Sequence, residues 1–254
     1  MKEKQLQQKK RRILWGWILA VLLLSISMGT VNVQAAKLKL NKTKVTVYKG
    51  CTETLKVTGS KKKVKWSSSK KAVASVSSSG KIKGKKKGTT VIYAKVGKQT
   101  LKCKVTVKEP SNAQRLNLAK KEARKIVKKY VISNLNTKER AFVLFQYLTE
   151  HCCWQLNQST EAYKKNYGNE AYAALILKKA ACSGYARAYK LLCEAAGIPV
   201  RHVNAGSWTH QWNEIKANGK WIKVDAYGGT FADTTGIRKS LLKENKNSSW
   251  CLNL

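Results

Sequence analysis

The chain has 254 residues, of which 43% are hydrophobic, so it can form one large folded domain or two small ones. Its 51 Lys and Arg residues against 13 Asp and Glu residues give a formal charge of +38. This composition excludes a disordered tail and predicts attraction to polyanions: nucleic acid, an anionic membrane or an acidic cell-wall polymer.

Residues 1–35 have the features of a secretory signal peptide. The basic segment MKEKQLQQKKRR precedes the apolar run ILWGWILAVLLL, and residues 33–35 offer small side chains suited to cleavage before Ala36. A membrane span needs about 20 apolar residues, so this shorter run predicts cleavage, with no membrane span in the mature protein. Because an exported protein does not meet DNA or RNA in its usual setting, we expect no specific nucleic-acid partner.

Residues 37–109 predict an all-β sandwich. Short runs such as KVTVY, TTVIYAKV and LKCKVTVKE alternate with a period of two and are separated by glycines. The segment holds 22 lysines, no arginine, and only Glu53 and Glu109 as acids. Such a surface favours diffuse, salt-sensitive attraction to an anionic cell-wall polymer; the alternative is a solvated surface that keeps strand edges from pairing. Cys51 and Cys103 are candidates for a bridge between the first and last strands.

The stretch WSSSKKAVASVSSSGKIKGKKKGTTVIYAKV, residues 66–96, resembles the bacterial Ig-like group 2 domain. The matching parts are Trp-Ser-Ser at its start, Ala-Val-Ala-Ser-Val, Gly-Lys-Ile-Lys-Gly, and the Gly-Thr that opens the next strand. The resemblance covers nearly all of residues 37–109 and implies an Ig-like fold.

Residues 110–114 are predicted as a linker, and residues 115–254 as a second, α+β domain. An apolar stripe predicts a helix over residues 113–131, and Asn136 with Glu139 forms a capping-box pattern for a second helix. A third helix begins near Cys182 and ends at Gly197. Three extended runs follow, PVRHVNAG, WTHQWNEIKA and KWIKVDAY, so helices precede strands.

The dipeptide Asn218-Gly219 predicts a two-residue hairpin turn between the last two runs. With that turn, Ile215 pairs with Ile222 on one face of the hairpin. His210 and Asp225 become diagonal neighbours on the other face, roughly 7 to 8 Å apart at the backbone.

Cys182 has three possible fates: nucleophile, half of a disulfide, or buried small residue. The seven cysteines are an odd number, which in an exported protein indicates one free thiol beside up to three bridges. Backbone N–H groups at a helix start stabilise a thiolate, and Cys182 stands at such a start. Cys193 lies about three helical turns further along, too far to bridge to Cys182. The sequence His151-Cys152-Cys153 lacks zinc spacing, so bridging or burial is preferred and no metal or cofactor is expected.

Three blocks in order resemble the core of the bacterial transglutaminase-like superfamily: ACSGYA with AGIP, HQWNEI, and GKWIKVD. The resemblance implies a papain-like α+β fold with Cys182 as nucleophile, His210 as general base and Asp225 as the acid that orients the histidine. The run after Asp225 departs from the family pattern, and Asp233 is the candidate for the later acid. Tyr172, ten residues before the nucleophile, is a weak candidate for a side-chain oxyanion donor.

These features predict a secreted or cell-surface bacterial enzyme that acts on peptide or protein amides through a thioester. Water as acceptor gives a peptidase or amidase, and a lysine amine gives a transglutaminase; the triad does not separate them. The alternative is a non-enzymatic surface-binding protein or adhesin in which the papain-like domain is a degenerate scaffold.

Overall fold

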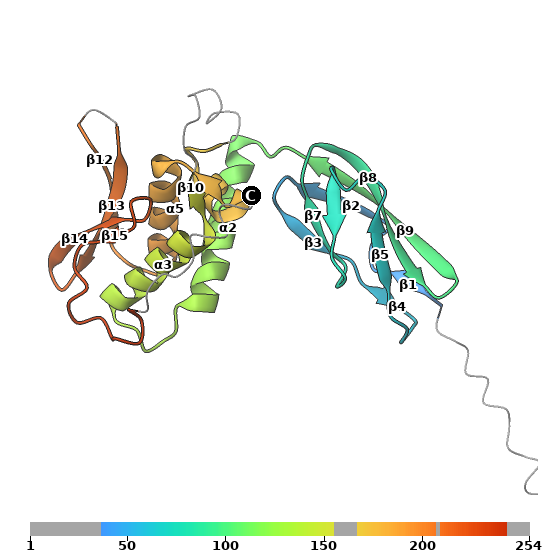
Figure 1. Cartoon of the computed structure of the whole chain (residues 1–254), viewed down its shortest axis with the longest axis horizontal. Coiled ribbons are helices and arrows are strands. Elements are labelled where there is room, and N and C mark those ends of the chain that lie inside the picture. Colours follow the sequence, from blue (N-terminus) through green and yellow to red (C-terminus); the bar gives the residue numbers. More distant parts are fainter. Residues whose placement is uncertain (1–36, 155–166, 207–208, 243–254) are drawn as a thin grey trace, which may run out of the picture.

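The computed structural model describes residues 37–154, 167–206 and 209–242, which form two lobes side by side (Figure 1). The first lobe contains only strands and ends at Lys108, and the second begins with a helix at Asn112. The predicted fold class, a β-sandwich followed by an α+β domain, is confirmed. The predicted signal peptide lies outside the described residues. Within the three described ranges, no helix combines the length and apolarity that a membrane crossing requires.

The first lobe is a sandwich whose alternating strands bury apolar residues between the sheets and turn lysines outward. Its four-stranded sheet has the order β2 (Lys44–Tyr48), β9 (Gln99–Lys108), β8 (Gly88–Val96) and β5 (Lys65–Ser68). The facing sheet contains β3 (Thr52–Thr54), β7 (Lys81–Gly84) and β6 (Ala74–Val76), and β1 (Lys39–Leu40) pairs with β4 (Val57–Thr58). Leu55 is buried between β3 and β4, where the chain passes from one sheet to the other.

Cys51 and Cys103 are both free, so the proposed bridge between them is wrong. Strand β2 does lie beside β9, but the two run parallel, with Lys44 opposite Lys104. Cys103 therefore lies level with the start of β2, whereas Cys51 follows its end. Five residues of strand separate these levels by roughly 16 Å, and a disulfide requires Cα atoms within about 7 Å.

The second lobe contains helices α2 (Asn112–Tyr130), α3 (Thr137–His151) and α5 (Cys182–Ala195), with a π-helical turn η1 (Ala173–Leu177). The capping box predicted at Asn136 and Glu139 is present. Helix α2 begins inside the segment predicted as a linker, because Ser111 and Gln114 form a second capping box there. Pro110 is buried, so the connection between the lobes is short and packed.

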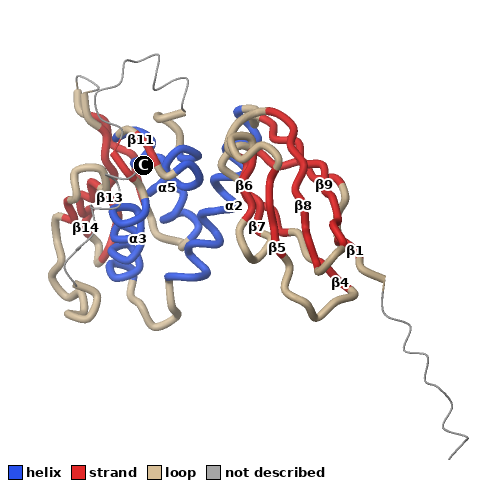
Figure 2. Tube along the Cα trace, turned by 45° about the vertical axis from the view of Figure 1, so that its right-hand side comes forward, coloured by secondary structure: helices blue, strands red, loops and turns tan. Residues whose placement is uncertain are grey.

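The sheet of the second lobe lies at the end remote from the sandwich, and α5 lies between this sheet and α2 (Figures 1 and 2). Its order is β12 (Val200–Asn204), β13 (Gln211–Ala217), β14 (Lys220–Asp225) and β15 (Thr230–Phe231), and a short parallel pair joins β10 (Cys153–Trp154) to β11 (Lys179–Ala180). The predicted register is confirmed: Ile215 pairs with Ile222, and both are buried. Asn218 and Gly219 have φ values of 51° and 78°, as a two-residue turn of this type requires.

Candidate active site

Cys182 is the first residue of α5 and its thiol is free. Ala181, the N-cap residue, has an extended backbone, and no side chain caps the helix. The first-turn N–H groups therefore keep their capacity to bind negative charge, as helix N-termini do. Cys182 is half-buried, so part of the residue is exposed to solvent.

The start of α5 is fixed by close contact with the segment before it. A Cβ atom at Gly184 would lie 2.3 Å from the carbonyl oxygen of Gly168 and 2.8 Å from Cβ of Ala180. The N–H of Ala181 donates to the same Gly168 oxygen at 3.0 Å. Only glycine at position 184 permits this approach, which gives a physical reason for the Ser-Gly that follows the cysteine.

His210 and Asp225 are in direct contact, as the hairpin register predicts. The Nε2 atom of His210 lies 2.6 Å from Oδ2 of Asp225, and Asp225 is 7% exposed. A carboxylate accepts hydrogen bonds, so Nε2 donates and the ring is held in one tautomer. The opposite nitrogen, Nδ1, is then the atom of His210 that can accept a proton.

The carboxylate of Asp225 is held by the turn that follows β14. The N–H of Gly228 donates to Oδ1 of Asp225 at 2.8 Å, and a Cβ atom at Gly228 would lie 2.7 Å from Oδ2. Gly228 therefore binds the carboxylate oxygen that His210 does not contact, and a side chain at position 228 would collide with the carboxylate. Sequence reasoning missed this residue; the paired glycines shortly after Asp225 were the available signal.

Tyr227 connects the hairpin to the face of α5 on which Cys182 stands. Its ring centroid lies 6.1 Å from that of His210 and 5.5 Å from that of Tyr185, edge to face. Tyr185 is three residues after Cys182 and shares its side of the helix. Trp154 adds a third ring, 5.9 Å from Tyr227. Tyr185 and Trp154 are contributions to the site that the sequence analysis did not identify.

Tyr172 does not have the role proposed for it. Its hydroxyl donates to the carbonyl oxygen of Lys49 in the sandwich, and the side chain is 1% exposed. Burial raises the pKa of this hydroxyl above its usual value. The hydroxyl of Tyr172 is therefore hydrogen-bonded at the junction between the lobes and is not available as an oxyanion donor.

The other two histidines have structural surroundings. His151 stacks on Tyr147, with centroids 4.4 Å apart, and its Nδ1 contacts the carbonyl oxygen of the same residue. The Nε2 atom of His202 lies 2.9 Å from the amide oxygen of Gln211, and burial lowers the pKa of His202. Among the described ion pairs, only that of His210 joins a histidine to a carboxylate.

Among the other described cysteines, Cys103, Cys152 and Cys193 are buried, Cys153 is bonded, and Cys51 is free and half-buried. Burial raises the pKa of the Cys152 thiol to about 12 and also raises the pKa of Cys193 and Cys103. Cys153 is disulfide-bonded, so bridging or burial describes both members of the Cys152-Cys153 pair. The expectation of a single free thiol is wrong, because five of the described cysteines are free. No group of three metal-ligating side chains occurs in the described parts of the chain.

Asp233 is a structural acid in this fold. Its Oδ2 lies 2.6 Å from Nζ of Lys138, a buried residue of α3, and its Oδ1 accepts from the N–H of Thr235. The hydrogen bond from Lys138 lowers the pKa of Asp233 to about 2. The later acid of the family pattern is therefore not supplied to the His210 site by Asp233.

This contact predicts a pH-dependent contribution to stability. The pKa of Asp233 in the folded protein is below its usual value of 3.8. The pair of Asp233 with Lys138 therefore stabilises the fold fully at pH values above 3.8. The contribution is lost as the pH falls through about 2, below which the carboxylate is protonated in both the folded and the unfolded state. We expect Asp233→Asn to lower the urea midpoint at pH 6, with the difference from the parent protein shrinking as the pH falls from about 4 to about 2. A difference independent of pH would contradict this assignment.

Solved structures similar to the chain include an S-layer protein and a transglutaminase. Domains 4 and 5 of the S-layer protein SbsC share 30% identity over 28% of this chain and 50% of that chain, with a TM-score of 0.24. A structure described as a TGase shares 14% identity over 58% of this chain and 46% of that chain, with a TM-score of 0.35. A GH10 xylanase from termite gut that contains a bacterial Ig-like domain shares 19% identity over 34% of this chain and 23% of that chain, with a TM-score of 0.27. The chain thus spans half or less of each of these structures, and no curated protein matches it.

Two family models match successive parts of the chain. Residues 27–107 match the bacterial Ig-like domain, group 2, which corresponds to the sandwich. Residues 124–226 match the transglutaminase-like superfamily, and this range includes Cys182, His210 and Asp225. The chain therefore combines a bacterial Ig-like group 2 domain with a domain of the transglutaminase-like superfamily.

Proposed function

We propose that the protein is a thiol-dependent acyltransferase or hydrolase of peptide or protein amides, located at the bacterial cell surface. The observation that carries this proposal is the contact between His210 and Asp225, together with Tyr227, whose ring lies against both His210 and Tyr185 of the helix that begins with Cys182. A nucleophile at a helix start, a base and an acid that fixes the tautomer of the base are the three parts of this chemistry.

In the proposed first step, the Sγ atom of Cys182 attacks the amide carbonyl carbon and its proton passes to Nδ1 of His210. The N–H groups of the first turn of α5 stabilise the oxyanion that forms. The C–N bond then breaks, the amine leaves with the proton from His210, and the acyl group remains on sulfur as a thioester. Asp225 orients the imidazolium and balances its charge throughout.

In the second step an acceptor attacks the thioester carbonyl and gives its proton to His210, and the Cys182 thiolate leaves. Water as acceptor produces a carboxylic acid, whereas a lysine amine produces a new amide. Both reactions proceed through the same acyl-enzyme, so the acceptor determines whether the protein is a hydrolase or a transglutaminase.

Incubation with a glutamine-containing peptide and a labelled primary amine tests the proposal. Release of ammonia with incorporation of the amine identifies transfer, ammonia release without incorporation identifies hydrolysis of the side-chain amide, and new peptide termini identify proteolysis. Absence of all three, together with failure of iodoacetamide to label Cys182 near neutral pH, would favour a non-enzymatic binding protein.

A lysine-lined cleft between the lobes supports an anionic polymer as the surface partner. The cleft has a volume of about 620 Å³ and is lined by lysines of both lobes. They are Lys81 and Lys83 of β7, Lys121 and Lys125 of α2, and Lys178. Glu122 also lines the cleft and pairs with Lys125 at 2.9 Å, but the lysines outnumber this acid and attract a negatively charged chain in a salt-sensitive manner. We propose that a teichoic-acid-type polymer binds in this cleft.

The triple variant with Lys81, Lys83 and Lys121 changed to glutamine is expected to weaken binding of a teichoic-acid-type polymer at least about tenfold at low salt. The matched control changes Lys85, Lys86 and Lys87, three exposed lysines of the loop after β7, and removes the same charge. Titration calorimetry at two salt concentrations measures both variants. Equal losses would show diffuse attraction to the whole lysine surface and would reject the cleft as the binding site.

A further inference from the structure

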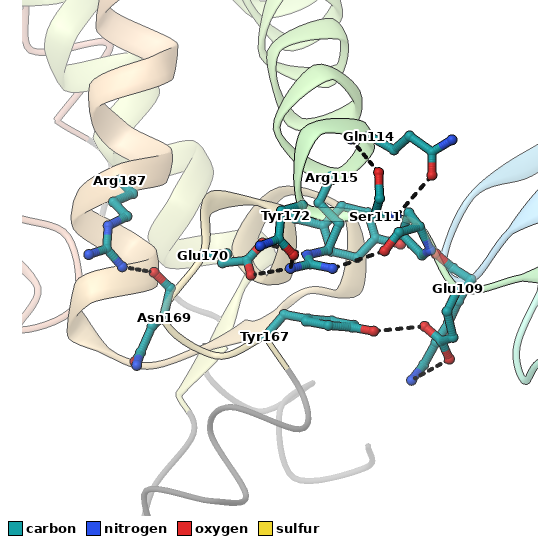
Figure 3. A network of polar contacts seen from close by, with 12 residues as sticks. Glu109, Ser111, Gln114, Arg115, Tyr167, Asn169, Glu170, Tyr172 and Arg187 are labelled. Atoms are coloured by element: carbon teal, nitrogen blue, oxygen red, sulfur yellow. Dashed lines mark hydrogen bonds and ion pairs between the residues drawn. The ribbon is translucent and has the colours of Figure 1, made fainter.

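The turn formed by residues 167–170 contacts the Ig-like domain on one side (Figure 3). The hydroxyl of Tyr167 donates to Oε2 of Glu109 at 3.0 Å, and Glu109 also pairs with Lys49 at 3.3 Å. Tyr167 has a φ of 59°, in the left-handed region that residues other than glycine rarely adopt. Such a conformation persists where surrounding contacts hold it, so the turn is fixed by its neighbours.

Arg115 of α2 joins this turn to the connection between the domains. Its Nε and Nη2 atoms donate to the two carboxylate oxygens of Glu170, both at 2.7 Å, and its Nη1 donates to the carbonyl oxygen of Pro110 at 2.9 Å. The guanidinium also lies 4.2 Å from the ring centroid of Tyr167. A two-pronged pairing between a buried arginine and a carboxylate fixes direction as well as distance.

The other side of the turn contacts the start of α5. The carbonyl oxygen of Gly168 accepts from the N–H of Ala181, and the side-chain oxygen of Asn169 accepts from the hydroxyl of Ser183 at 2.9 Å. The carbonyl oxygen of Asn169 also accepts from the guanidinium of Arg187, one turn further along the helix. The residues immediately before and after Cys182 are therefore both tied to the same turn.

We propose that residues 167–170 form a positioning clamp through which the Ig-like domain and Arg115 fix the orientation of Cys182. This inference rests on the proposed function, in which Cys182 is the nucleophile. Glu109, Arg115, Tyr167 and Glu170 act through the helix start and touch no substrate, so they are positioning residues. A displacement of about 1 Å at a reacting atom can reduce the rate by up to 10²-fold, so small movements of the clamp are sufficient to affect Cys182.

Two variants of the full chain test the clamp from its two ends. Glu170→Gln removes the charged pairing with Arg115, and Tyr167→Phe removes only the hydrogen bond to the Ig-like domain. We expect kcat to fall about tenfold for the first and about threefold for the second, with KM within twofold of the parent value. We expect the rate of Cys182 alkylation by iodoacetamide at pH 7 to fall by similar factors, with recovery at high pH, where any accessible thiol is ionised.

The control is Glu194→Gln, which removes an exposed ion pair with Lys190 on the same helix, 3.9 Å long and remote from the clamp. Its kcat and alkylation rate are expected to equal those of the parent. Cys193 is fully buried and reports unfolding, because it is labelled only when the helix opens. If Cys193 is labelled in Glu170→Gln, that variant has unfolded. The alkylation rate of Cys182 in Tyr167→Phe then tests the clamp.

The alkylation rate separates failure of the clamp from failure of the proposed function. Unchanged alkylation of Cys182 in the folded clamp variants overturns the clamp, whatever the activity of the parent protein. Slowed alkylation supports the clamp even if the parent protein shows no acyl transfer, in which case the proposed function alone fails.

Discussion

Replacement of Cys182 by serine is expected to abolish amine incorporation and peptide hydrolysis, with a loss of at least ~10⁴-fold in kcat. A serine hydroxyl is far harder to ionise than a thiol, so His210, the base of the proposed mechanism, would activate it poorly. The measurement is the release of ammonia or of new peptide termini by the parent protein and the variant at equal concentration. Because Cys182 is half-buried and its replacement is nearly isosteric, the thermal midpoint is expected to change little.

Cys103→Ala is the matched control for this experiment. Cys103 is also a free thiol, but it lies in the core of the sandwich. Its loss is expected to cost about 1 kcal/mol of stability and to leave the activity unchanged. If Cys182→Ser retained most of the activity, another group would be the nucleophile and the proposed mechanism would be rejected.

Replacement of Asp225 by asparagine is expected to lower kcat by about 10³- to 10⁴-fold while the protein stays folded. The amide can donate a hydrogen bond to Nε2 of His210, which would turn the proton of the ring towards Cys182. The Nδ1 atom of His210, which is the proton acceptor in the proposed mechanism, would then already carry a hydrogen and could not accept the proton of the thiol. The pH dependence of kcat in the parent and the variant measures the loss and shows whether the base still titrates.

The only other aspartate of the chain supplies the control. Asp233→Asn makes the same chemical change in an acid that pairs with Lys138 instead of a histidine. Its activity near neutral pH is expected to equal that of the parent. Similar losses in both variants would show that the effect comes from general destabilisation and would contradict the role assigned to Asp225.

The parts of the structure that the sequence predicts correctly are those set by local rules. The turn at Asn218-Gly219 determines the hairpin register, and the register brings His210 to Asp225. The capping box at Asn136 likewise determines where α3 begins. In each case a few adjacent residues carry the information, and tertiary contacts do not alter it.

Features that depend on distant contacts were not predictable in this way. Tyr172 precedes the nucleophile at a plausible spacing, but its direction is set by packing against Lys49, 123 positions earlier. Arg115 lay at the boundary of a predicted linker, and nothing near it in the sequence indicates that Glu170 is its partner. Cys51 and Cys103 are free because β2 pairs with β9 in parallel. The alternation of apolar and polar residues alone does not specify the direction of that pairing.

The direction of β9 sets the distance between the two ends of the Ig-like domain. Gly97, which precedes this strand, lines one pocket with Lys37, and β1 and β4 lie at the end of the sandwich away from the second lobe (Figure 1). The strand then runs ten residues, roughly 30 Å, to the connection at Pro110. A partner bound at that end of the Ig-like domain would therefore lie about one sandwich length from the connection to the second lobe, and the domain would act as a spacer between them.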